Sequence, residues 1–422
     1  MEKKVMEADK STAALLTKKP AASKGFFFLL GYSLNDESFM VGVLKDNAIL
    51  PVGSFATGLK REEARSLLET IRTHQVRSDR TAIRVNPGIC VELSFDAAEG
   101  DRLINPAFRS FQFGMDWKAC TWNKLIVDQA PVRPEVKLTH PDKIVWDNPR
   151  IDKEGYAAYL VQIAPQMLPF LKNRVLTTIR YVHGVPGEAF YQKNCPDYAP
   201  DFIQTAVESG IRYIVCNDLS TLLWLGNQLA IEFHIPFQTV GEEKPLEIVF
   251  DLDPPGRERF PLAVKAASEL RTVFEQFGIR SYPKLSGGKG LQIHIPLSRN
   301  TSLTYDDTRI FTAFIADYLV ERFPDDFTTE RLKKNRGARL YVDYIQHAAG
   351  KTIVCPYSAR GNAEATVAAP LYWDEVNARL RPDTYNLPFV LNRLATGEEP
   401  MRDFFEQENK ALIPLIAQLK HK

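Results

Sequence analysis

The chain has 422 residues, of which 45% are hydrophobic and 25% charged, and its formal net charge is +1. Such a composition is typical of a soluble globular protein with roughly two to three domains, and it excludes binding to nucleic acid through overall charge, so any basic surface must be local. The five cysteines are scattered without a C-x-x-C pair, and no apolar run has the length of a membrane span, which predicts a cytoplasmic protein without disulfides, a zinc site or a membrane anchor.

The first 120 residues divide into a polar head and a β-rich unit. Residues 1–24 are rich in Lys, Ala, Ser and Thr, a composition that predicts a disordered head. The hydrophobic patterns of the next segments predict strands at 26–32, 39–44, 48–52 and 89–95 and an amphipathic helix over 60–73. Short strands around one helix predict a small β barrel of the OB type over residues 25–120.

The rest of the chain interleaves helical and strand patterns. Residues 121–136 contain Pro131, Pro134 and mixed charges, which favour a linker. From 137 to 422 the patterns predict strands at 212–216, 246–250, 290–297 and 339–345 and helices at 261–277 and 306–323. We therefore expect a multi-domain α+β protein, in which mixed sheets with flanking helices follow the barrel.

A pair of aspartates, Asp251 and Asp253, follows the apolar run 246–250 and precedes a Pro-Pro-Gly turn. Alternate residues of a strand face the same way, so both carboxylates project from one face at the end of a strand. Such a pair is either a solvated acidic turn or part of a site for a hard cation such as Mg²⁺ or Mn²⁺.

Two further segments favour the cation site. Residues 286–290 read Ser-Gly-Gly-Lys-Gly, a turn whose backbone N–H groups can cradle a phosphate, although the spacing is not that of a Walker motif and a flexible glycine hairpin is the alternative. Asp343 ends a strand-like run, with Arg336 and Arg339 close by in the sequence. Three carboxylates from separate strands are what a two-metal nucleotidyl-transfer site needs, and the arginines suit a triphosphate.

Several segments together resemble the polymerase domain of LigD, the bacterial non-homologous end-joining protein, which belongs to the archaeo-eukaryotic primase superfamily. The matching pieces follow the family order; they are 180–193, 224–234, the Asp-Leu-Asp-Pro motif, the Ser-Gly-Gly-Lys-Gly-Leu loop, Val342-Asp343 and 351–360. The resemblance implies that Asp251, Asp253 and Asp343 hold two Mn²⁺ or Mg²⁺ ions. It also implies roles in binding NTP or dNTP substrates for a larger set of residues, namely His234, Ser286, Lys289, Arg336, Arg360 and the base-stacking pair Phe190 and Tyr191.

Two lysines and one departure complete this resemblance. Lys143 and Lys153 match the lysines that hold a DNA 5′-phosphate at a gap or break. The family ends its glycine loop with Gly-Leu-His, whereas this chain has Gln292 in place of the histidine. Gln292 can still hydrogen-bond a phosphate or hydroxyl of the nucleotide but carries no charge, and His294 on the same strand face is a partial substitute.

Residues 25–118 resemble the C-terminal OB domain of an ATP-dependent DNA ligase, on the segments 50–58, 87–93 and 103–109. The Lys-x-Asp-Gly motif that carries a ligase's covalent adenylate does not occur in the chain, so no ligase activity is expected from it. The resemblance to LigD implies a DNA repair polymerase of the cytoplasm and nucleoid that acts on gapped duplex and DNA ends, prefers ribonucleotides and cooperates with Ku and a separate ligase. The alternative hypothesis is a non-catalytic module that tethers DNA ends.

Overall fold

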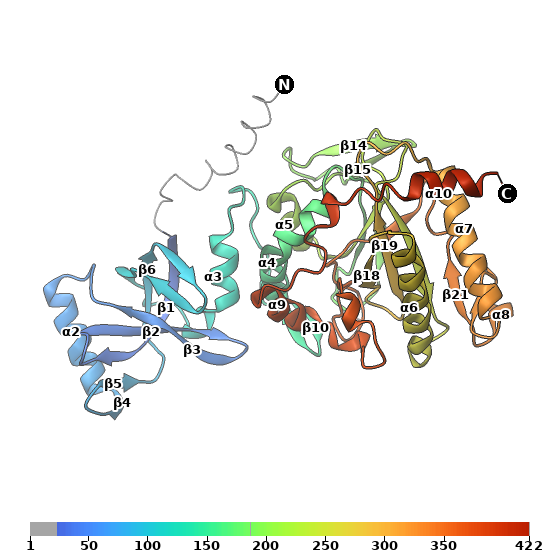
Figure 1. Cartoon of the computed structure of the whole chain (residues 1–422). Helices are drawn as coiled ribbons and strands as arrows, with labels where there is room; N and C mark the ends of the chain where they lie inside the picture. Colours follow the sequence, from blue (N-terminus) through green and yellow to red (C-terminus); the bar gives the residue numbers. More distant parts are fainter. Residues whose placement is uncertain (1–22, 186, 422) are drawn as a thin grey trace, which may run out of the picture. The chain divides into compact units, whose positions relative to one another are not determined.

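The computed structural model describes residues 23–185 and 187–421, which fall into two compact units divided between Ala130 and Pro131 (Figure 1). The predicted disordered head lies outside the described residues, except that Ser23 and Lys24 begin strand β1 (Ser23–Ser33). Within the described ranges, no helix combines the length and the apolar character needed to cross a bilayer.

The first unit is a closed barrel with one helix between its third and fourth main strands. Strands β1, β2 (Ser38–Lys45) and β3 (Ala48–Phe55) form an antiparallel meander, and β6 (Cys90–Phe95) pairs with β1 and with β9 (Ala107–Phe111). A parallel bridge between Thr57 and Ala107 closes the barrel in the order β1-β2-β3-β9-β6. The remaining elements are α2 (Arg61–Thr73), β4 (Gln75–Ser78), β5 (Ala82–Val85), β7 (Ala97–Glu99) and β8 (Arg102–Ile104). This strand order is that of the expected OB-type barrel.

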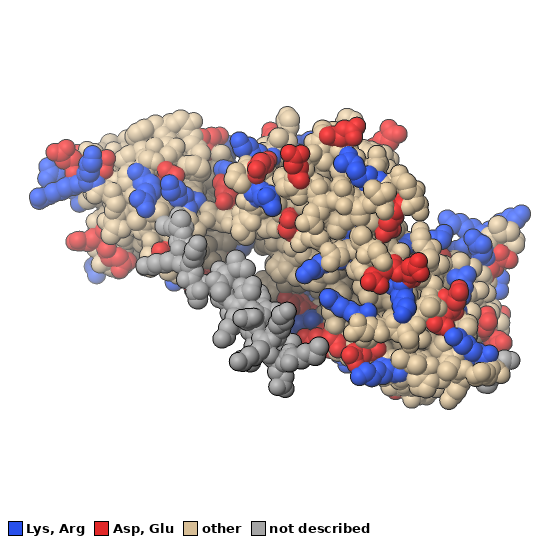
Figure 2. Space-filling model, turned by 90° about the horizontal axis from the view of Figure 1, so that it is seen from above, with Lys and Arg blue, Asp and Glu red and all other residues tan. Residues whose placement is uncertain are grey.

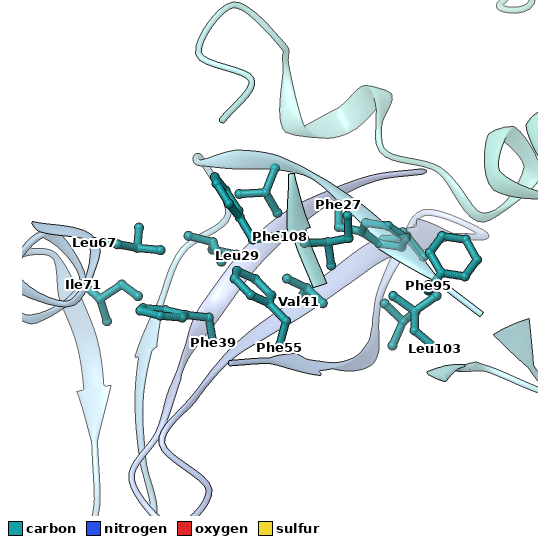
Figure 3. Close-up of a cluster of buried hydrophobic side chains, with 14 of the residues drawn as sticks. Phe27, Leu29, Phe39, Val41, Phe55, Leu67, Ile71, Phe95, Leu103 and Phe108 are labelled. Atoms are coloured by element: carbon teal, nitrogen blue, oxygen red, sulfur yellow. The ribbon is translucent and has the colours of Figure 1, made fainter. Parts of the chain in front are cut away.

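Alternating apolar residues of these strands form the core of the barrel. Phe27 and Leu29 of β1 and Phe39 and Val41 of β2 are buried, as expected from the period of two (Figure 3). Helix α2 covers the core with Leu67 and Ile71, which are four residues apart and therefore share one helix face.

At the point of closure, Gly58 has a φ of +96°, and a Cβ there would lie 2.2 Å from the carbonyl oxygen of Phe108, so only glycine allows the two backbones to approach.

The expected linker, residues 121–136, is shorter than the sequence indicated. Its first part forms helix α3 (Trp122–Gln129), which Thr121 caps by accepting a hydrogen bond from the Lys124 N–H. Leu125 of this helix lies in the barrel core. Trp122 also packs against this core, and Gln129 Nε2 donates to the Lys24 carbonyl at 2.6 Å, so the helix belongs to the first unit and both prolines lie after it.

The second unit contains two mixed sheets that place the candidate site. The four-stranded sheet has the order β13 (Phe190–Gln192), β12 (Thr177–Arg180), β16 (Ala230–Pro236) and β22 (Thr352–Val354). The five-stranded sheet has the order β18 (Tyr282–Leu285), β19 (Leu291–Pro296), β17 (Glu247–Asp253), β21 (Leu340–Asp343) and β20 (Phe327–Thr328). All pairs are antiparallel except β20 and β21.

Helices α6 (Phe260–Gln276) and α7 (Tyr305–Arg322) cover one face of the five-stranded sheet (Figure 1). Phe250 of β17 packs there against Phe274 and Phe311, with ring centroids 5.7 and 6.1 Å away. Because strand residues alternate, Asp251 and Asp253 point to the opposite face, away from these helices. Both helices begin and end within one residue of the predicted bounds, whereas β17 continues three residues past its predicted end.

The other elements of the second unit surround these sheets; they are β10 (Ile144–Asp147), β11 (Arg150–Asp152), α4 (Lys153–Leu171), β14 (Thr205–Glu208), β15 (Ile211–Ile214), α5 (Leu219–Asn227), α8 (Lys333–Arg336), α9 (Leu387–Ala395) and α10 (Leu412–Leu419). Five 3₁₀ turns complete the described chain; they are Trp117–Ala119, Arg257–Arg259, Trp373–Glu375, Pro382–Thr384 and Phe404–Glu406. On the face drawn in Figure 2, lysine and arginine side chains are interspersed with aspartate and glutamate, in keeping with the near-zero net charge.

Candidate active site

A row of polar residues crosses four adjacent strands of the five-stranded sheet. The strand registers pair Lys284 with Gln292, Gln292 with Asp251, and Asp251 with Asp343. Residues that lie directly opposite each other in neighbouring strands point to the same face, so all four side chains share the face that α6 and α7 leave free. Asp253 is two residues beyond Asp251 and lies on this face as well.

The two carboxylates that pair across β17 and β21 have raised pKa values. Burial raises the pKa of Asp251 to about 6, and the negative charges of Asp343 and Asp253 add to the effect. Burial likewise raises the pKa of Asp343, although Tyr341 and the Gln346 N–H donate hydrogen bonds to its Oδ1 at 3.2 and 3.0 Å. Burial is the main cause of both shifts, and the neighbouring carboxylates contribute less.

Asp253 is paired with two cations in this conformation. Lys289 Nζ lies 3.0 Å from its Oδ1, and Arg336 Nη1 lies 3.5 Å from its Oδ2. The Arg336 guanidinium also stacks on the Tyr341 ring, 3.8 Å from the centroid. With Asp253 turned to these cations, no three acidic, histidine or cysteine side chains among residues 23–185 and 187–421 form a preorganised metal-binding group.

The donor set nevertheless fits a hard divalent cation. Asp251, Asp253 and Asp343 offer carboxylate oxygens on one sheet face, which are the ligands that Mg²⁺ and Mn²⁺ take. A cation among them would favour the charged form of Asp251 and Asp343, whose pKa values are raised by burial and to a smaller extent by carboxylate neighbours.

The glycine loop at 286–290 joins β18 to β19 and is stabilised by hydrogen bonds between its own residues. Ser286 Oγ accepts hydrogen bonds from the N–H groups of Gly288 and Gly290 at 3.2 and 3.1 Å. Gly287 has a φ of +71°, and a Cβ there would lie 2.5 Å from Cγ of Arg360. The loop therefore has one tight shape, and Lys289 at its end faces Asp253.

A buried glutamate organises two of the predicted nucleotide-binding residues. Glu232 Oε2 lies 3.0 Å from Nε2 of His234, and its Oε1 accepts the Gly361 N–H at 3.0 Å and lies 3.3 Å from Nε of Arg360. Arg360 Nη1 also donates to the Ser286 carbonyl at 2.9 Å. Burial would raise the pKa of Glu232, but the hydrogen bond from His234 and the charge of Arg360 outweigh it and lower the pKa. Glu232 thus connects the four-stranded sheet to the glycine loop through Arg360.

Gln292, expected to contact the nucleotide, is hydrogen-bonded to other protein side chains. Its side chain is 3% exposed, its Oε1 accepts from Lys284 Nζ at 2.5 Å, and its Nε2 donates to Asp251 Oδ1 at 3.1 Å. Both ends of the amide are therefore engaged by protein groups. His294, expected as a partial substitute, is fully buried and bonded to Glu247, so it is not available to a ligand.

The aromatic pair lies on the edge strand β13. Phe190 and Tyr191 are 41% and 73% exposed, and as neighbours in a strand they point to opposite faces. The Arg180 guanidinium lies 5.1 Å from the centre of the Phe190 ring. The exposed Phe190 ring therefore lies against the charged Arg180 side chain.

The two lysines predicted to bind a 5′-phosphate come together at the start of helix α4. The Lys153 N–H donates to the Lys143 carbonyl at 2.8 Å. Lys153 Nζ donates to the Thr139 carbonyl at 2.7 Å, and Lys143 Nζ donates to the Val182 carbonyl at 2.5 Å. Burial and the neighbouring charge of Lys143 lower the pKa of Lys153 to about 8. Neither lysine forms an ion pair with a carboxylate of the described residues.

Sequence reasoning missed Lys284 and Glu232. Glu232 is two residues before His234 in β16, so the period of two could have placed both on one face. Lys284 offered no such signal, because only the register of β18 with β19 places it beside Gln292.

Comparison with known proteins shows several similarities. The sequence model of the LigD primase-polymerase domain matches residues 152–401. The bifunctional non-homologous end joining protein LigD of Bacillus subtilis is 44% identical over 400 residues, which cover 94% of this chain and 65% of that protein. The multifunctional LigD of Mycolicibacterium smegmatis is 31% identical over 268 residues, covering 61% of this chain and 34% of that protein.

A solved structure, the polymerase domain from Mycobacterium tuberculosis ligase D in complex with DNA, superposes with a TM-score of 0.60 at 27% identity. The match covers 64% of this chain and 98% of that domain. The chain spans at most about two thirds of the length of these curated relatives.

Proposed function

Because the chain belongs to the LigD primase-polymerase domain family, we propose that it is a nucleotidyltransferase that extends the 3′-hydroxyl of DNA at gaps and double-strand breaks. The observation that carries this proposal is the row of carboxylates on β17 and β21 beside a glycine loop and two arginines. We propose ribonucleotides as its preferred substrates, as the family resemblance implies.

Asp251, Asp253 and Asp343 would hold two divalent cations, Mn²⁺ or Mg²⁺. When bound, these ions lower the pKa of the attacking hydroxyl and neutralise the charge of the triphosphate. The protein supplies the positions of the groups, because phosphoryl transfer is catalysed mainly by placement and electrostatics. Lys289 and Arg336 now pair with Asp253 and would lie beside the triphosphate, so their charges would add to its neutralisation.

The nucleotide would lie between the two sheets of the second unit. Arg360 and the Ser286 loop are bonded to each other, and His234 is oriented by Glu232, so these groups form one preassembled wall. A charged arginine fork suits phosphate oxygens, and Phe190 or Tyr191 offers an exposed ring for a base.

Lys143 and Lys153 would receive a 5′-phosphate at the far side of a gap or break. We further propose Ku and a separate DNA ligase as partners. Sealing by this chain is not expected, since its sequence lacks the Lys-x-Asp-Gly motif of adenylating ligases.

The test is extension of a gapped, 5′-phosphorylated duplex by the pure protein with Mn²⁺, run with ribonucleotides and with deoxyribonucleotides. We expect incorporation with either sugar and faster incorporation of ribonucleotides. Intact end binding without any incorporation would refute the polymerase and leave the end-tethering module as the function. Incorporation that continues after treatment with a metal chelator would refute the metal dependence.

Recognition of the 5′-phosphate should depend on pH through Lys153. With a pKa of about 8, this lysine is charged at pH 7 and loses its proton as the pH rises above 8. A charged hydrogen bond to phosphate contributes about 1.5–3 kcal/mol, so we expect the preference for phosphorylated over unphosphorylated ends to fall about 10- to 100-fold between pH 7 and pH 10. Fluorescence anisotropy with both duplexes at each pH measures this ratio.

The matched variants are Lys153→Ala and Lys172→Ala, the second at an exposed lysine at the other end of α4. Lys153→Ala should lower the preference at pH 7 about 10- to 100-fold and make what remains independent of pH, whereas Lys172→Ala should behave like the wild type. A preference that stays constant to pH 10 in the wild type would show that Lys153 does not contact the phosphate.

A further inference from the structure

Lys284 of β18 is a buried lysine, and burial lowers its pKa to about 7. Its side chain is fully buried, and no carboxylate of the described residues forms an ion pair with it. Its Nζ donates to Gln292 Oε1 at 2.5 Å, to the Val354 carbonyl at 3.3 Å and to the Leu285 carbonyl at 3.5 Å. Burial of a polar group is costly unless it is hydrogen-bonded, and these three acceptors satisfy the donors of Nζ.

The first consequence concerns the amide of Gln292, whose two ends could be exchanged by rotation. Lys284 Nζ lies 2.5 Å from Oε1 of Gln292 and donates a hydrogen bond to this oxygen. An ionised Asp251 only accepts, so it requires the NH₂ end. The two contacts agree on one orientation of the amide, in which Gln292 presents an N–H to Asp251 Oδ1.

The second consequence concerns the two sheets. Val354 belongs to β22, which pairs with β16 and so with the strand that carries His234. Gln292 belongs to β19, which pairs with the strand that carries Asp251. The Lys284 Nζ thus donates to both sheets, and it connects the sheet that carries the carboxylates to the sheet that carries His234.

We propose that Lys284 is a positioning residue for nucleotide addition: it orients Gln292, which holds the Asp251 carboxylate in place for a divalent cation. This proposal rests on the proposed function. Gln292 then contacts Lys284 and Asp251 instead of the nucleotide. The same two contacts explain how glutamine can stand where the resemblance to LigD predicts histidine. A neutral imidazole can accept from Lys284 at one nitrogen and donate to Asp251 at the other, as the amide does.

The test begins with Lys284→Met, which keeps the length of the side chain and removes the ammonium. Loss of outer partners of metal ligands lowers metal affinity or activity by about 10- to 100-fold, so we expect kcat and the Mn²⁺ affinity measured by calorimetry to fall by that factor. The KM for the nucleotide should change less than about twofold, because uniform binding is not affected. The melting temperature should stay within a few degrees, since relief of the buried charge offsets the lost hydrogen bonds.

Gln292→His and Gln292→Glu separate this pair of contacts from a merely structural role. The histidine variant should keep Mn²⁺ affinity and kcat close to the wild type, because it can accept and donate. The glutamate variant keeps an acceptor for Lys284 but has no donor for Asp251, and it should lose both. Lys244→Met, at an exposed lysine of the same unit, is the control for removal of a positive charge.

Three outcomes would overturn the inference while the wild type adds nucleotides. They are unchanged kcat and Mn²⁺ affinity in Lys284→Met, equal loss in the histidine and glutamate variants, or a raised nucleotide KM with unchanged Mn²⁺ affinity. An inactive wild type that still binds Mn²⁺ would refute the proposed function instead, and the calorimetric comparison would still decide whether Lys284 supports the carboxylate.

Discussion

Replacing Asp251 by asparagine should lower the rate of nucleotide addition at least about 1000-fold, which corresponds to about 4 kcal/mol of transition-state stabilisation. Asp251 is the central carboxylate of the row, with Gln292 on one side and Asp343 on the other. Asparagine keeps the size and can still accept from Gln292, but it removes the charge that would hold a cation. The measurement is single-turnover extension of the gapped duplex with saturating Mn²⁺.

The fold of this variant should survive. The pKa of Asp251 is already raised to about 6 by burial and by its carboxylate neighbours, so loss of its charge removes a repulsion. We expect an unchanged or higher melting temperature and unchanged binding of 5′-phosphorylated ends. Asp317→Asn, at an exposed position of α7, is the matched control and should retain full activity. If Asp251→Asn kept more than a tenth of the wild-type rate, the metal assignment would be wrong.

The second large effect is on stability, and it concerns Glu247 at the other end of β17. Glu247 is 1% exposed, and its two oxygens lie 2.7 Å from Nη1 of Arg174 and 2.7 Å from Nδ1 of His294. Glu247→Ala would leave the Arg174 charge buried without its partner. Breaking a buried pair in this way costs about 3–5 kcal/mol, which is a large part of the stability of a domain.

Hydrogen exchange of peptides that cover β17 and β19 measures this loss in the second unit alone. The exposed Glu243→Ala is the control and should change exchange little. A loss below about 1 kcal/mol for Glu247→Ala would mean that the pair is not a main support of the sheet, since that is the size of an ordinary surface effect.

The contribution of Glu247 should also depend on pH. Burial would raise the pKa of Glu247, but Arg174 and His294 outweigh it and lower the pKa to about 2. A lowered carboxyl pKa stabilises the fold above the unfolded pKa of about 4.3, and this stabilisation is lost as the pH falls towards 2. The difference between wild type and Glu247→Gln should therefore be full at pH 6 and shrink between pH 4 and pH 2.

Local patterns in the sequence determined much of the fold. The alternation in β1, β2 and β6 predicted the barrel strands, and the helical periods of α6 and α7 predicted those helices to within one residue. These signals are readable because each of these elements buries one face and exposes the other. Helix α4 has no such signal, since it is buried on most sides and contains Pro165 and Pro169.

The sequence by itself also determined which residues could form a site: the aspartate pair at the end of a strand, the glycine loop and the basic segment before Asp343. Only the tertiary structure decided how they meet. Lys284, Gln292, Asp251 and Asp343 form one row because four strands from distant segments pair in one register. Side-chain period is a local property, whereas register and burial depend on contacts between segments far apart in the chain, and these gave Gln292 and Glu232 their partners.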